Sequence, residues 1–174
     1  GYIVRTLANP TEVWDNPFVA QQDDFGRTIV LLIALNGKPS LEGDLAEAYS
    51  RYISRPENAG LKGHRDFISN LRHLTGSLVN RTISSGVVGR NSTLELFNPS
   101  LGDYVLRRYV GDAPTLRMGF LSLRTCSSVD TLKNLVGSEI VSIRVARDIC
   151  RAIVVEATAS TFDGYAVDYI ASVA

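Results

Sequence analysis

Hydrophobic positions recur along most of the chain with the period of an α-helix. Residues 29–35 (Ile-Val-Leu-Leu-Ile-Ala-Leu) are apolar nearly all round, as is typical of a helix buried on every side. Asp23 or Asp24 can cap the start of this helix, and Gly37 can end it. The pattern therefore predicts a central buried helix.

Three further helices are predicted on the same basis in the first 75 residues. A short helix from Pro10 to about Gln21 precedes the central one, and a loop over 54–63 separates the other two. Each helix has an apolar face at helical spacing. The faces comprise Val13, Trp14 and Phe18 in the first helix, Leu41, Leu45, Ala48, Tyr49 and Tyr52 in a helix opened by Pro39-Ser40, and Phe67, Ile68, Leu71 and Leu74 in a helix over 64–75.

Two strands follow these helices, over 78–84 and 92–97. Gly86 and Gly89 lie between the two strands, which favours a β-hairpin. Helices followed by a short hairpin are the layout of a winged helix, with the third and fourth helices in the helix-turn-helix positions and the hairpin as the wing. The predicted fold class is mainly α, with a winged-helix-like module over 1–110.

The segment 93–109 changes from strand period to helix period. Leu94 and Leu96 alternate with polar residues, whereas Leu101, Tyr104, Val105 and Tyr109 have helical spacing. Pro99 suits the first turn of a helix, and Asn98 or Ser100 can cap it. A strand that runs into a helix start often presents polar groups to a phosphate or a partner.

From Gly111 onward the pattern predicts amphipathic helices joined by short turns. One helix is expected around 116–123, a shorter one around 129–136, and two longer ones with apolar residues at 146–157 and 162–173. A strand over 141–145 is the alternative to a helix there. The region 111–174 is therefore predicted to be the truncated start of an α-helical array. Both chain ends suggest a piece cut from a longer protein.

Composition and motifs give little support for catalysis. The 18 basic residues balance 18 acidic ones, so no general attraction to nucleic acid or to an anionic membrane is expected. There is no G-x-x-x-x-G-K-[ST], G-x-S-x-G or H-E-x-x-H motif and no metal-type Cys/His spacing. Asp23-Asp24 is interpreted as a helix cap, and Cys126 and Cys150 as buried free thiols. Neither a signal peptide nor a membrane span is predicted.

A nucleic-acid interface remains an alternative on the winged-helix module. The candidate contacts on the fourth helix and the hairpin are Arg65, Asn70, Arg72, Arg81 and Arg90. A winged helix can place such groups in a groove. Asp66 and the neutral overall charge make this alternative the weaker one.

Residues 7–110 resemble the segment that follows the nucleotide-binding core in the novel STAND NTPases, bacterial signal-transduction ATPases with numerous domains. The most specific match is at 96–105, Leu-Phe-Asn-Pro-Ser-Leu-Gly-Asp-Tyr-Val. Residues 7–14, Leu-Ala-Asn-Pro-Thr-Glu-Val-Trp, resemble the Asn-Pro…Trp pattern with which the family segment begins. Further similarity covers 45–49 and 67–78. The match spans about 60% of the chain.

The resemblance implies a regulatory fragment of a larger cytoplasmic protein, without catalysis or a cofactor of its own. The parent would bind ATP or ADP and act in signalling or defence against phage. The expected partners are the NTPase core and sensor repeats of the same chain, and assembly with identical chains is also allowed. The resemblance makes Asn98 and Ser100 candidate nucleotide-sensing residues, because related NACHT-type proteins carry a histidine at the comparable position. A DNA-binding transcription regulator and a helical protein-interaction scaffold are the alternatives.

Overall fold

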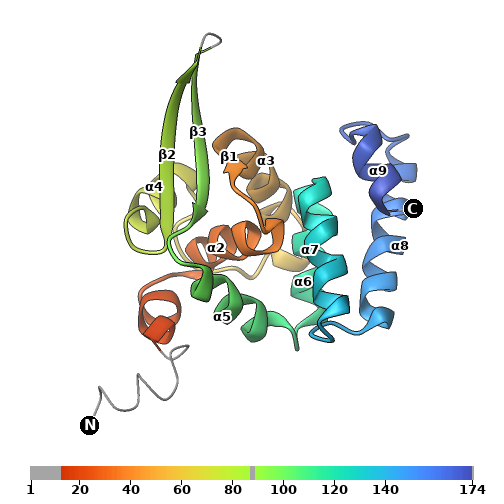
Figure 1. Cartoon of the computed structure of the whole chain (residues 1–174), viewed down its shortest axis with the longest axis horizontal. Coiled ribbons are helices and arrows are strands. Elements are labelled where there is room, and N and C mark those ends of the chain that lie inside the picture. The colour runs from red at the N-terminus through yellow and green to blue at the C-terminus, as the bar shows by residue number, and fades with distance from the viewer. Residues whose placement is uncertain (1–12, 87–88, 174) are drawn as a thin grey trace.

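The computed structural model describes residues 13–86 and 89–173 and has a mainly helical fold with one small antiparallel sheet (Figure 1). Its first part has the element order of a winged helix. The elements are α2 (Asp24–Asn36), β1 (Ser40–Leu41), α3 (Glu42–Ile53), α4 (Phe67–Leu74), β2 (Val79–Gly86) and β3 (Gly89–Leu96). The sheet order is β1-β3-β2, with Ser40 opposite Leu94 and Val79 opposite Leu96.

Helix α2 lies at the centre of the molecule, as its apolar sequence predicts. Asp23 caps the helix by accepting a hydrogen bond from the Gly26 amide at 2.8 Å. Gly37 ends it in the left-handed conformation, with φ of 69°, which glycine adopts without a steric penalty. Every residue from 28 to 36 is buried.

The N-terminal helical segment, η2 (Asp15–Ala20), places Phe18 in the core. The ring of Phe18 meets those of Tyr104 and Tyr109 edge-on, at centroid distances of 5.8 and 6.4 Å, a favourable aromatic geometry. The predicted start of this helix at Pro10 lies outside the described residues.

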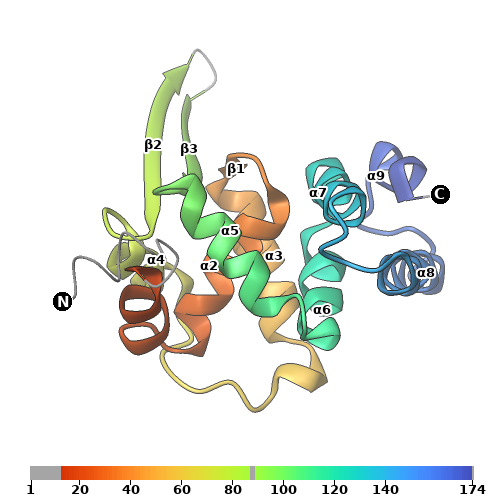
Figure 2. The ribbon, with the colours of Figure 1, turned by 60° about the horizontal axis from the view of Figure 1, so that its bottom comes forward.

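Five helices follow the wing; the first three pack on the winged helix, and the last two pack on the helices before them. They are α5 (Pro99–Tyr109), α6 (Ala113–Leu123), α7 (Cys126–Gly137), α8 (Ile143–Ala159) and α9 (Val167–Val173). Helix α6 contacts α2 and α3, and α7 contacts α2. The buried residues consequently form one continuous core. Figure 2 shows the wing at one end of the molecule and α8 and α9 at the other. The division near residue 110 stays a prediction.

Several local predictions were wrong at element boundaries. The third helix begins at Glu42, because Ser40 and Leu41 form β1 against Thr93 and Leu94. The fourth begins at Phe67, because Asp66 caps it by accepting from the Ser69 amide at 2.7 Å. Both Leu41 and Ile68, expected to pack inward, are 45% exposed. The predicted loop after α3 contains a short 3-10 helix, η3 (Pro56–Asn58).

The C-terminal predictions needed two corrections. The helical spacing that begins at Phe162 does not correspond to one helix, because Thr161 and Phe162 both have positive φ. Phe162 is therefore exposed in a turn, and α9 starts only at Val167. Cys126 is exposed rather than buried. Residues 141–145 are not a strand, since α8 starts at Ile143 behind a Ser142 cap.

Candidate functional site

The Asn98–Ser100 junction folds as the predicted capped connection between β3 and α5. The Asn98 side-chain oxygen accepts a hydrogen bond from the Ser100 amide at 2.9 Å. The Ser100 hydroxyl accepts one from the Trp14 indole N–H at 3.0 Å. Both candidate sensor residues thus have structural roles, although Asn98 itself is exposed. Because the cap uses the amide oxygen, the amide nitrogen of Asn98 is the group that can donate to a ligand.

A second contact secures the N-terminal segment to the same helix. The Tyr104 hydroxyl donates a hydrogen bond to the Asp15 carboxylate. Burial, and then this carboxylate, raise the pKa of Tyr104 to about 12, so the phenol stays protonated at neutral pH. The Asn98 junction is therefore held on one side by segment 14–18 and on the other by the sheet.

The five candidate nucleic-acid residues differ in how they are presented. Arg65 and Arg72 have exposed side chains. Asn70 is 7% exposed and donates to the carbonyls of His64 and Asp66, so it holds the start of α4 rather than facing a groove. Arg81 is bonded to Glu42, at 2.7 and 3.2 Å. The backbone of Arg90 lies in β3 opposite Ser85, and its side chain is outside the description.

A groove runs between the start of α3, helix α4 and the wing, on the face where a winged helix would meet nucleic acid. We call it the wing groove; its cavity volume is about 730 Å³. Exposed apolar side chains and acidic groups line much of it. Its lining includes Leu41, Glu42, Asp44, Ile68, Arg81 and Ile83. With Arg81 neutralised by Glu42, this surface offers phosphate little positive charge.

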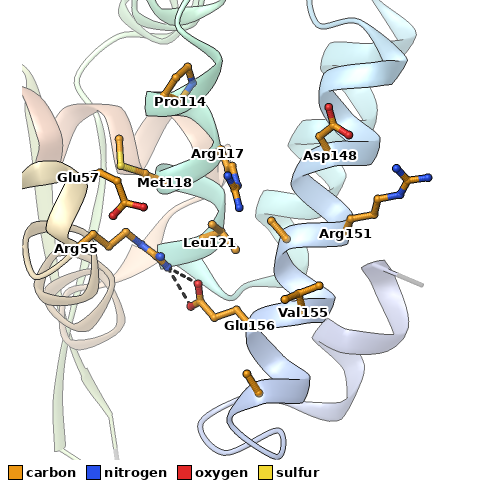
Figure 3. Close-up of a pocket in the computed structure, with 12 residues that line it drawn as sticks. Arg55, Glu57, Pro114, Arg117, Met118, Leu121, Asp148, Arg151, Val155 and Glu156 are labelled. Atoms are coloured by element: carbon orange, nitrogen blue, oxygen red, sulfur yellow. Dashed lines mark hydrogen bonds and ion pairs between the residues drawn. The ribbon is translucent and has the colours of Figure 1, made fainter.

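A cluster of charged side chains, separate from the wing groove, joins three segments of the chain near the end of α8. Arg55 donates to both Glu156 carboxylate oxygens at 3.0 Å, and Arg124 to one of them at 3.3 Å (Figure 3 draws the Arg55 pair). The Tyr165 hydroxyl donates to the same carboxylate at 3.2 Å, and the Arg124 guanidinium lies 3.9 Å from the Tyr165 ring centre. We call these four residues the Glu156 cluster.

The surroundings of the Glu156 cluster explain its electrostatics. The Arg55 and Arg124 side chains are only 16% and 20% exposed. Burial, followed by the Glu156 carboxylate, raises the pKa of Tyr165, which keeps its hydroxyl a donor. Sequence reasoning missed the cluster, because Arg55 and Glu156 are 101 positions apart and no local pattern relates them.

An open cleft between α6 and α8 lies beside the Glu156 cluster, with a volume of about 700 Å³. Met118 and Leu121 of α6 and Val155 of α8 supply apolar surface (Figure 3). Arg117 and Arg151 balance Glu57 and Asp148 in its lining. This balanced composition favours no anionic or cationic ligand.

Among residues 13–86 and 89–173, no group of three or more His, Cys, Asp or Glu side chains is arranged to hold a metal ion. Within the same ranges, no helix has both the length and the apolar character needed to cross a bilayer.

No protein-family model, no curated protein and no solved structure matches the chain.

Proposed function

We propose that this chain is a regulatory coupling module of a larger STAND-like NTPase in signalling or phage defence. In this proposal the winged helix meets a nucleotide-binding core, and α6–α9 lead towards sensor repeats. The module does not itself hydrolyse ATP, and the parent works in the cytoplasm with bound ATP or ADP. The proposal rests on the motif at 96–105, which the resemblance associates with this family.

The geometry around that motif suits a coupling role. Helix α5 begins at the motif and packs against α2, which also contacts α6 and α7. A displacement at the Asn98 junction would therefore act directly on the central helix and on the helices that follow. Rigid, continuously packed elements are the means by which a local change is transmitted.

Turnover by the isolated chain provides the first test. Purified protein incubated with ATP and Mg²⁺ is expected to release no phosphate beyond a protein-free blank. Turnover well above the blank would contradict the proposal. A phosphate-binding loop encoded upstream of Gly1 is the expected companion result, and its absence from the full gene would leave the family interpretation without a catalytic core.

A substitution in the full-length protein can distinguish a nucleotide-sensing role of Asn98 from its role as a helix cap. Asn98→Asp keeps an oxygen that accepts from the Ser100 amide but removes the amide donor and adds a negative charge. If Asn98 contacts nucleotide phosphate, nucleotide affinity should fall several-fold in Asn98→Asp while the melting temperature changes little. Equal affinity in both proteins would restrict Asn98 to capping.

DNA binding is the second candidate function, favoured by the exposed Arg65 and Arg72 beside a helix-turn-helix arrangement. A gel shift that weakens steeply with salt and disappears in Arg65→Ala/Arg72→Ala would support it. The acidic and apolar lining of the wing groove argues against it, and we expect no shift at physiological salt.

A further inference from the structure

The wing presents one long strand edge, which is bonded at Val79 and pairs with no described residue beyond it. Strand β2 is the outermost strand of the order β1-β3-β2. In Figures 1 and 2 the upper half of β2 projects beyond the body, with β3 on one side and no labelled helix or strand on the other. A strand edge with unpaired amides and carbonyls is a template for another strand.

The hydrogen bonding of the hairpin shows which backbone groups point outward. The Phe97 amide donates to the Leu78 carbonyl at 2.9 Å, so these facing residues form a hydrogen-bonded pair. Because such pairs alternate along an antiparallel ladder, even-numbered positions of β2 bond to β3 and odd-numbered ones face away. The Val79 carbonyl agrees with this rule, since it accepts from the Gly76 amide at 2.9 Å on the outer side.

The outward amides and carbonyls of Arg81, Ile83 and Ser85 have no backbone partner among the described residues. Features that usually protect an edge are also missing. Strand β2 is eight residues long and contains neither proline nor lysine, the residues that commonly block edge pairing. Its charged side chain, Arg81, is held by Glu42, and Ile83 is 57% exposed.

We propose that two copies of the chain pair through β2, antiparallel and about a two-fold axis at Ile83. Ile83 then faces Ile83 of the second copy, and Arg81 faces Ser85 of the second copy. This register uses all three outward positions and leaves out Val79, which is already bonded. The two three-stranded sheets become one continuous sheet of six strands.

We assign the strand that pairs with β2 to a second copy of the chain, because the β2 edge is self-complementary in this register. An isologous contact requires each outward position to meet a compatible one on an identical surface. Arg81 meets a serine rather than another arginine, and the two isoleucines form an apolar cross-strand pair. Because the paired segment is short, the contact is expected to be a concentration-dependent monomer–dimer equilibrium.

Sedimentation velocity over a concentration series tests this proposal with the chain as it stands. Wild type is expected to shift from the 19.0-kDa chain mass towards twice that mass as concentration rises. Ile83→Pro and Ser85→Pro remove outward amides that β3 does not use, a position that tolerates proline. Both variants are expected to stay monomeric, with circular dichroism confirming that they fold.

Ile83→Thr is the matched control, because threonine keeps the backbone amide and favours the strand. It should still dimerise, with a several-fold weaker association. Amide hydrogen exchange gives an independent readout: the amides of Arg81, Ile83 and Ser85 should gain protection with concentration in wild type.

Three results would overturn the proposal. A wild-type chain that remains monomeric at all concentrations would leave this edge to a strand from another protein. Dimerisation unchanged in both folded proline variants would place the interface elsewhere. Assemblies larger than a dimer would also contradict it, because two-fold pairing consumes the free edge of each copy.

Discussion

Asn36 provides the sharpest test of how the winged helix is joined to the helices after it. This last residue of α2 is 3% exposed. Its side-chain oxygen accepts from the hydroxyls of Thr125 at 2.6 Å and Ser127 at 3.1 Å. Its nitrogen donates to the Lys38 carbonyl at 2.8 Å and the Ser40 hydroxyl at 3.0 Å. One buried amide thus connects α2, β1 and the start of α7.

Asn36→Ala removes all four of these hydrogen bonds. At a net ~0.5–1.5 kcal/mol each, their loss would cost roughly 2–6 kcal/mol. Ser40, Thr125 and Ser127 border a cavity of about 160 Å³, so water can satisfy some of the abandoned groups. We therefore expect the lower half of that range, about 3 kcal/mol, and a melting temperature lower by roughly 6–12 °C.

Urea unfolding followed by circular dichroism measures this loss. Asn134→Ala is the matched control, because Asn134 is exposed on α7 and should change stability by less than about 0.5 kcal/mol. A loss under about 1 kcal/mol for Asn36→Ala, or one equal to the control, would refute the claim that this amide secures the junction.

Two further predictions concern the start of α2. Gly63 has φ of +125°, and a Cβ there would lie 2.1 Å from an Asp23 carboxylate oxygen. In thermal melts, Gly63→Ala should therefore lose about 3 kcal/mol of stability through backbone strain and a disturbed helix cap. Gly60→Ala is the control and should be nearly neutral, because a Cβ at Gly60 meets nothing within 4 Å. The Lys62 amide lowers the pKa of Asp24 below its ordinary 3.8; a depressed folded pKa means that this stabilisation is complete above about pH 4 and is lost as pH falls through the folded value. Unfolding free energies measured down to pH 3 should therefore decline less steeply in Asp24→Asn, and an identical decline would contradict this role.

Helices and strands that are specified by residues close together in the sequence were predictable. Asp23, the apolar run and Gly37 specify α2 within one stretch of chain, so the cap, the burial and the end of that helix were predicted and are confirmed. The wing was predictable for the same reason, since its two strands adjoin. In both cases the residues that decide the structure are close in sequence.

Elements that exist only through distant partners were not predictable. A strand as short as β1 has no periodicity of its own and forms because Ser40 pairs with Leu94. Phe162 keeps the helical spacing of its neighbours, but the backbone takes positive φ there, which spacing does not reveal. The nucleic-acid candidate Asn70 had a suitable side chain, yet the backbone around His64 and Asp66 uses it.

The Glu156 cluster is consistent with the coupling proposal at the far end of the molecule from the wing. Two largely buried guanidiniums, those of Arg55 and Arg124, share one carboxylate. Separating α8 from the winged helix would leave these positive charges without their counter-ion, at a cost of several kcal/mol if they stayed buried. Arg55 lies two residues after the end of α3, and Glu156 belongs to α8. A shift of α3 that does not move α8 would expose the arginines to water. The ion pairs therefore favour concerted movement of α3 and α8 over independent movement, and a coupling module requires such concerted movement.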